Sequence, residues 1–164
     1  MPTDRLTANI KPVAPFNFEL TAGYHTYFQS RYGTDTMEDG VYRRLLDLDD
    51  KLVLAKVWSV GTVDAPELAI DLQGPELGPD DVELATARVS WLLGVDQDLA
   101  PFYELGRADK AMVGLVDEFY GLHVPHTATV FEALILAVLG QQISTKVARI
   151  IRILLIETFG PSAE

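Results

Sequence analysis

The sequence has no cysteine and no long hydrophobic run, and each absence excludes a class of protein. Without cysteine among its 164 residues, the chain forms no disulfide, no thiolate zinc site and no cysteine nucleophile, which suits a reducing compartment. The longest apolar stretches, Ala133–Leu139 and Ile153–Ile156, are far shorter than the roughly 20 residues of a membrane-spanning helix. Residues 1–13 mix charges and prolines, unlike a secretory signal. We therefore predict a soluble, cytoplasmic protein with no membrane partner.

Positive charge is also scarce. The chain carries 13 lysines and arginines against 24 aspartates and glutamates, a formal net charge of −11. An extended basic face for DNA is therefore not expected. The balance differs in residues 126–160, where two acids, Glu132 and Glu157, stand against Lys146, Arg149 and Arg152. Any contact with nucleic acid must come from that end, and the remainder is predicted to be an acidic, solvated surface.

The first half of the chain has the pattern of strands and turns. Apolar and polar residues alternate over Pro15–Leu20, which predicts a half-buried strand, and aromatics at helical spacing predict a short helix over Ala22–Ser30. Two apolar-rich segments, Val41–Leu48 and Leu52–Val60, flank an Asp-Asp-Lys turn and predict a hairpin. A further strand is predicted over Glu67–Leu72. Together these elements predict a small antiparallel sheet.

The pattern then becomes helical. Asp80 and Asp81 stand where acidic residues favour the start of a helix, and an apolar stripe runs from there to Gly94. Two shorter helices are predicted over Leu99–Leu105 and Ala108–Tyr120. We therefore place a domain boundary where the first long helix ends.

Two apolar helices joined by Gly-Gln-Gln-Ile-Ser follow. Thr127 or Thr129 caps the first helix and Ser144 caps the second. The predicted inward residues are Phe131, Leu134, Ile135 and Val138 in the first helix and Val147, Ile150, Ile151, Leu154, Leu155 and Thr158 in the second. Ile153 and Ile156 fall outside this stripe. Because a helix that is apolar on nearly all sides is normally covered from several directions, we expect the chain to self-associate through these helices.

The charged pairs and histidines offer little chemistry. Neighbouring carboxylates, at positions 49 and 50, 80 and 81, and 117 and 118, lie in predicted turns or helices, where solvation is the expected role. His123 and His126 lie in a Pro-containing loop, without the helical i, i+4 pair of a zinc enzyme. We predict no metal site and no cofactor. On residue types alone, the glutamines satisfy exposed helix-end carbonyls, and the chain is a soluble α+β protein.

Residues 121–160 nevertheless resemble a known family. Gly-Leu-x-Val-Pro, Phe-Glu-Ala-Leu and Leu-Gly-Gln-Gln-Ile-Ser begin at Gly121, Phe131 and Leu139, and a Phe-Gly pair at Phe159 closes the segment. This order looks like the start of the catalytic domain of helix-hairpin-helix DNA glycosylases, of the DNA-3-methyladenine glycosylase II type. The likeness is strongest at the Leu-Gly-Gln-Gln-Ile-Ser motif.

A second likeness lies near the N-terminus. Pro15–Phe18 followed by Gly23 and Tyr24 resembles the opening of the family's N-terminal domain, so the likeness spans most of the chain. The resemblance implies an α+β fold. A small antiparallel β-sheet with flanking helices, like the TBP-like N-terminal domain of DNA glycosylases, would occupy residues 1–95, and an incomplete helical bundle would occupy residues 96–164.

The resemblance also implies a reaction, hydrolysis of the N-glycosidic bond of alkylated purines of the 3-methyladenine type in double-stranded DNA. Such a base must be flipped out of the stack, and a side chain fills the vacated space. By resemblance, Gln142 is that wedge and Gln141 supports its loop. Tyr24 would line the base pocket, where an aromatic face attracts an electron-poor purine. The candidate phosphate contacts at the start of the last helix are Ser144, Lys146 and Arg149.

The sequence departs from the family in the parts that perform the reaction. It has neither the Leu-Pro-Gly-(Val/Ile)-Gly hairpin that grips DNA nor the aspartate that follows it, and His123 stands where the family usually has a basic residue. We therefore assign no catalytic residue and expect this chain to be inactive, as the N-terminal part of a glycosylase truncated before the helix-hairpin-helix motif. Two other interpretations stay open: a non-catalytic α+β binding or interaction module, and an unrelated acidic scaffold with a chance Gln-Gln loop.

Overall fold

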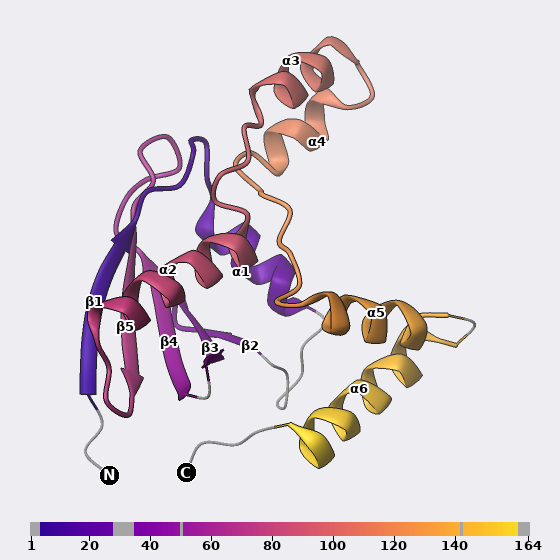
Figure 1. The fold of residues 1–164 in the computed structure, drawn as a ribbon. Helices are drawn as coiled ribbons and strands as arrows, with labels where there is room; N and C mark the ends of the chain where they lie inside the picture. Colours follow the sequence, from indigo (N-terminus) through magenta and orange to yellow (C-terminus); the bar gives the residue numbers. More distant parts are fainter. Residues whose placement is uncertain (1–3, 28–34, 50, 142, 161–164) are drawn as a thin grey trace.

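The computed structural model describes residues 4–27, 35–49, 51–141 and 143–160, and the fold is α+β, as the sequence predicts (Figure 1). One five-stranded antiparallel sheet has the order β1-β5-β4-β3-β2. Its strands are β1 (Asp4–Ile10), β2 (Asp35–Glu38), β3 (Val41–Leu48), β4 (Lys51–Ser59) and β5 (Leu68–Gly74). The first strand thus pairs with the fifth, and Ile10 lies opposite Leu68.

The hydrophobic core lies between the sheet and two helices, α1 (Phe18–Tyr27) and α2 (Pro79–Leu93), which cover one face (Figure 1). The inward side chains of the central strands are fully buried, among them Ala55 and Val57 of β4 and Ile70 and Leu72 of β5. Burial of apolar surface contributes roughly 25 cal/mol per Å². This layered region therefore carries most of the stability of the described chain.

The predicted hairpin over residues 41–60 is confirmed. Strands β3 and β4 pair from Tyr42 opposite Val57 to Leu48 opposite Lys51. Asp49 follows β3 with a φ of 49°, in the left-handed region that Asp tolerates better than most residues. The tight connection sets the register, and the alternating pattern puts every second side chain into the core.

The strand predicted over Pro15–Leu20 is wrong, because helix α1 begins at Phe18. The Asn17 side chain accepts a hydrogen bond from Leu20 N at 3.1 Å, and its carbonyl accepts one from Thr21 N at 3.0 Å. Asn17 therefore initiates the helix, a role that Asn performs well. The alternation arose because Phe16 and Phe18 both point into the core, one before the helix and one at its first position.

Strands β1 and β2 were not predicted from the sequence. Both lie at edges of the sheet, where half of the hydrogen-bonding groups and one side are open to solvent. Strand β1 therefore carries polar residues such as Arg5 and Asn9, and β2 spans four residues. Neither has the apolar content that marks a central strand.

Helix α2 starts and ends where the sequence predicts. The Asp81 carboxylate accepts hydrogen bonds from Gly78 N at 2.8 Å and from Lys51 Nζ at 2.9 Å. The backbone hydrogen bond from Gly78, and then the Lys51 ammonium, lower the pKa of Asp81 below its usual value. At the other end, Gly94 adopts a φ of 58° and stops the helix.

Two short helices, α3 (Ala100–Ala108) and α4 (Val113–Glu118), extend away from the sheet (Figure 1). The helix predicted over Ala108–Tyr120 is therefore shorter than expected. The chain turns at Asp109, whose carboxylate accepts a hydrogen bond from Ala111 N at 2.8 Å. An aspartate that bonds its own following backbone competes with helix formation.

The last two helices, α5 (Val130–Leu139) and α6 (Thr145–Phe159), form a hairpin that stands beside the sheet (Figure 1). Thr129 and Ser144 cap them, as predicted: Thr129 Oγ1 accepts from Glu132 N at 3.0 Å and Ser144 Oγ from Val147 N at 3.4 Å. Across the described residues, no helix is long and apolar enough to cross a membrane.

The predicted inward faces of α5 and α6 are largely wrong. Neither helix has a buried residue, and Phe131, Leu134 and Val138 are 73%, 60% and 62% exposed. On α6, Val147, Ile150 and Leu154 are exposed, whereas Ile153 and Ile156 are half-buried. The helical period was read correctly, but the two helices pack mainly on each other, so neither apolar stripe is fully covered.

Candidate nucleic-acid interface

The connection between α5 and α6 forms the tip of the hairpin. Helix α5 ends with hydrogen bonds from Gly140 N to Leu136 O at 2.9 Å and from Gln141 N to Val138 O at 3.1 Å. Gln141 is exposed there, and Gln142 lies outside the described residues. The described residues of this connection, Gly140, Gln141, Ile143 and Ser144, are exposed and stand between two capped helices.

The start of α6 lies next to this tip and is electropositive. Lys146 and Arg149 are exposed on its first turns, and the helix N-terminus adds a partial positive charge with outward-pointing N–H groups. The Ser144 hydroxyl is occupied as the cap of the helix. A groove of about 280 Å³ runs beside Arg149, between the end of α5 and the start of α6.

Tyr24 lies on a different element. It stands on α1, against the sheet, and its side chain is 55% exposed. The predicted site residues therefore divide into two groups, Tyr24 on the sheet side and Gln141, Ser144, Lys146 and Arg149 on the hairpin. An exposed tyrosine offers an aromatic face and a hydroxyl to a ligand.

His123 is a structural residue in this fold. It is fully buried, with Nδ1 2.6 Å from Gly94 O and Nε2 2.9 Å from Pro15 O, and its ring lies edge-on to Phe16. The ring thereby joins three segments of the chain. Within the described ranges, no three His, Asp or Glu side chains gather as metal ligands do.

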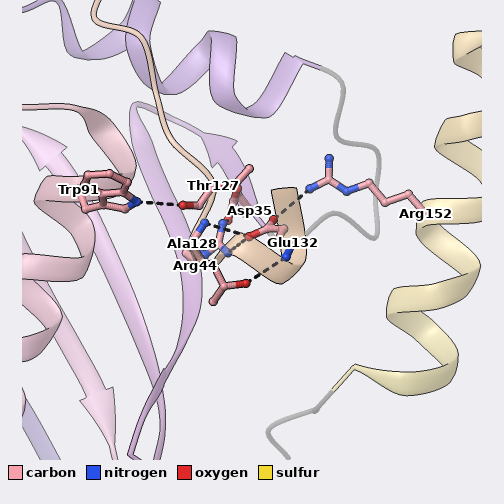
Figure 2. Close-up of polar contacts among 8 residues, drawn as sticks. Asp35, Arg44, Trp91, Thr127, Ala128, Glu132 and Arg152 are labelled. Atoms are coloured by element: carbon pink, nitrogen blue, oxygen red, sulfur yellow. Dashed lines mark hydrogen bonds and ion pairs between the residues drawn. The ribbon is translucent and has the colours of Figure 1, made fainter. Parts of the chain in front are cut away.

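The segment before α5 is fastened to the end of α2. The His126 ring stacks on Trp91 with ring centroids 4.3 Å apart, and His126 N donates to Leu92 O at 2.9 Å. Trp91 Nε1 donates to Thr127 O at 2.9 Å (Figure 2). This attachment fixes where the hairpin leaves the sheet region.

A network of charges connects the hairpin to the sheet, and it was not predicted (Figure 2). Arg44 Nη1 lies 2.7 Å from Asp35 Oδ1, and Arg44 Nη2 lies 3.1 Å from Glu132 Oε2. Arg152 Nη2 on α6 lies 3.5 Å from Glu132 Oε1. The signal for it was the alternation in β3, which turns Arg44 to the same face as the buried Tyr42 and Leu46, where a charge needs a partner.

Burial and neighbouring charges together set the pKa values in this network. Burial, followed by the charge of Asp35, raises the pKa of the Tyr42 hydroxyl well above its usual value. Burial alone would lower the pKa of Arg44, but Asp35, Tyr42 and Glu132 outweigh it and the pKa is raised. The guanidinium therefore stays charged and paired.

An apolar cavity of about 380 Å³ lies between the two helices and this network. Its walls come mainly from the hairpin, including Phe131, Ile135 and Phe159, and the charged network contributes the polar part of its lining. Phe159 is 79% exposed. The hairpin thus presents a concave apolar surface at its open end, opposite the tip.

The fold matches that of part of a solved DNA glycosylase. A 3-methyladenine DNA glycosylase from Archaeoglobus fulgidus superposes with a TM-score of 0.74 over 96% of this chain and 52% of that one, at 23% sequence identity. This likeness confirms the α+β class and extends through the hairpin.

The sequence comparisons point to the same type. A DNA-3-methyladenine glycosylase of Bacillus subtilis is 43% identical over 70 residues, which is 43% of this chain and 23% of that protein. A protein of Mycobacterium tuberculosis named as a probable bifunctional transcriptional activator/DNA repair enzyme AlkA is 33% identical over 137 residues, 82% of this chain and 26% of that one. No protein-family model matches the chain. The chain spans about a quarter of the length of these relatives, and the resemblance to helix-hairpin-helix DNA glycosylases is confirmed.

Proposed function

We propose that this chain is part of a DNA base-excision repair glycosylase that hydrolyses the N-glycosidic bond of alkylated purines in double-stranded DNA. The observation that carries the proposal is the exposed tip of the α5–α6 hairpin, where Gly140, Gln141 and Ile143 of the Gly-Gln-Gln-Ile-Ser motif lie beside a basic helix start. The names of the relatives support it. The chain supplies the parts that open the duplex, and it contributes no catalytic carboxylate that we can name.

The proposed division of labour follows the two groups of residues. Gln142 enters the duplex and Gln141 supports its loop. An extruded alkylated purine is met by the exposed face of Tyr24, because a cationic ring is attracted to an aromatic one. Lys146, Arg149 and the N–H groups at the start of α6, capped by Ser144, bind the phosphates on either side of the wedge.

The acidic surface limits this binding. With a net charge of −11, the chain as a whole repels phosphate, and the basic start of α6 is the proposed exception. We therefore propose weak, salt-sensitive affinity for undamaged duplex and a preference for a site where a base is already missing, because the wedge then enters without an unstacking cost. The proposed compartment is the cytoplasm.

The test is fluorescence anisotropy with two matched duplexes at low salt, one containing a tetrahydrofuran abasic analogue. Tighter binding to the abasic duplex is expected, with loss of the preference in Gln142→Ala. Lys146→Ala should weaken binding to both duplexes, whereas Lys110→Ala, an exposed lysine between α3 and α4, should change neither. Equal affinity for the two duplexes in the parent chain would contradict the proposal.

We also propose that the 164-residue chain self-associates through residues 130–159. Val130, Phe131 and Phe159 are more than 70% exposed, and each large apolar side chain left in water forgoes roughly 1.5–3 kcal/mol of burial. A second copy of the same hairpin offers a self-complementary surface, as two-fold dimers require.

Light scattering over a concentration series tests this association. The particle mass should rise above one chain, and Leu134→Glu should return it to a monomer. Leu105→Glu is the matched control, because Leu105 is 76% exposed on α3, away from the hairpin. A monomeric parent chain at high concentration would refute self-association.

A further inference from the structure

Glu132 is the point where three parts of the molecule meet. Its carboxylate contacts the sheet through Arg44, the incoming segment through Ala128 and the second helix of the hairpin through Arg152 (Figure 2). We infer that Glu132 is a positioning residue that fixes the angle of the α5–α6 hairpin to the sheet. Its consequence for DNA rests on the proposed function.

The geometry gives Glu132 one contact in each direction. Oε2 accepts from Arg44 Nη2 at 3.1 Å and from Ala128 N at 3.0 Å, and Oε1 lies 3.5 Å from Arg152 Nη2. The side chains of Glu132 and Arg152 are each 19% exposed. Partly buried charge pairs are screened less than exposed ones, so these contacts hold more firmly than surface ion pairs.

The sheet end of this connection is buried and paired. Arg44 is 7% exposed on its side chain and is paired with Asp35, whose side chain is 0% exposed, at 2.7 Å. An arginine held by a buried carboxylate on one nitrogen presents its second nitrogen in a fixed direction. Glu132 is therefore held in position relative to β3.

Another attachment of the hairpin lies before α5 begins. The contacts of Trp91 with His126 and Thr127 fix the chain before α5 begins. Neither helix has a buried residue that would lock it by packing. Without a further contact, α5 pivots about its first residues. Glu132, in the first turn of the helix, opposes that pivot.

Helix α5 is long enough for a small change in its angle to displace the tip loop. The 10 residues of α5 span about 15 Å at 1.5 Å per residue. A pivot of about 10° therefore moves the tip loop by nearly 3 Å relative to the sheet. Displacements of about 1 Å are enough to impair a site that needs aligned groups. The contact thus sets the separation between Tyr24 and the Gln141 loop.

The first experiment measures the angle without DNA. Since the chain has no cysteine, the pair Thr7→Cys and Thr145→Cys places two spin labels on exposed positions of β1 and of α6 next to the tip. Pulsed electron–electron resonance should give a narrow distance distribution that broadens by about 3 Å in Glu132→Gln. The control Glu157→Gln removes the same charge from an exposed position of α6 and should leave the distribution narrow.

Two outcomes of this measurement decide the inference. An unchanged distribution in Glu132→Gln overturns it. If far-ultraviolet circular dichroism shows that this variant also loses the sheet, Glu132→Asp replaces it, because aspartate keeps the charge on a shorter side chain. An unchanged distribution in Glu132→Asp likewise overturns the inference.

The second experiment measures the ratio of affinities for the abasic and undamaged duplexes, which a loss of stability alone does not change. Glu132→Gln should lower this ratio of affinities about 5-fold. Its affinity for the undamaged duplex should equal that of the control Glu157→Gln. An unchanged ratio contradicts the positioning role. A parent chain with no preference refutes the proposed function instead, and the distance measurement still decides whether Glu132 holds the hairpin.

Discussion

The sheet region and the α5–α6 hairpin are built in opposite ways. The sheet and its two helices enclose a core whose central side chains are fully buried, whereas the hairpin has no buried residue and exposes much of its apolar surface. The hairpin nevertheless carries the motif that most resembles the family. One region supplies stability and the other presents functional residues, so their connection decides whether the two act together.

The largest expected effect comes from that connection. Arg44→Met removes the guanidinium that pairs with the fully buried Asp35 carboxylate, which should lower the free energy of unfolding by about 3–5 kcal/mol. Arg43→Met, on the adjacent exposed side of β3, should cost less than about 1 kcal/mol. Urea denaturation measures both, and equal costs would show that the Arg44 pair does not stabilise the sheet.

Cavity-forming substitutions should separate the two regions next. Ile70 of β5 is 0% exposed, and Ile70→Ala should lower the free energy of unfolding by about 2–5 kcal/mol. Leu134 is 60% exposed, so Leu134→Ala should change the free energy of unfolding by no more than about 0.5 kcal/mol. Chemical denaturation at a concentration low enough for the chain to be monomeric provides the comparison. A large loss from Leu134→Ala would mean that the hairpin is packed in solution.

A smaller effect should be confined to the hairpin. Thr129→Ala removes the side-chain cap of α5 and should destabilise that helix by about 1 kcal/mol. Thr127→Ala, which changes a residue with no capping bond to α5, is the control. Amide hydrogen exchange should accelerate in α5 and not in β4 or β5. Acceleration throughout the sheet would mean that the two regions unfold as one unit.

The smallest expected effect is a dependence on pH at the start of α2. The folded pKa of Asp81 lies below its ordinary value of 3.8, so its contribution to stability is present above that pH. The contribution is lost as the pH falls through the lower, folded pKa. Asp81→Asn should therefore flatten the decline of stability below pH 3.8, and Asp80→Asn should not. Identical acid profiles for the two variants would contradict this assignment.

Local signals predicted a large part of this structure. The β3–β4 hairpin, the limits of α2, and the caps Thr129 and Ser144 were all readable because each depends on neighbouring residues: a turn, an acidic helix start, a hydroxyl before an apolar run. Edge strands were missed because half of their surroundings is solvent. Their sequences are therefore as polar as those of loops.

The features that depend on distant residues were not predictable. The contact between Arg44 and Glu132 joins positions 88 residues apart, and no local pattern relates them. The exposed stripes of α5 and α6 show the same limit. Hydrophobic periodicity identifies the apolar face of a helix, but it does not indicate whether another element covers that face. His123 was weighed as a metal ligand from its neighbours, although its contacts, Gly94 and Pro15, lie far away in the chain.

The pairing of β1 with β5 sets an order of events during synthesis. The first strand leaves the ribosome long before its partner exists, because Ile10 pairs with Leu68. At about 5–20 residues per second, β1 waits roughly 3–12 s for that residue. During this interval the β3–β4 hairpin, whose strands are adjacent, has time to form. The edge that receives β1 is therefore completed last, and the nascent chain exposes an unpaired strand edge until β5 emerges.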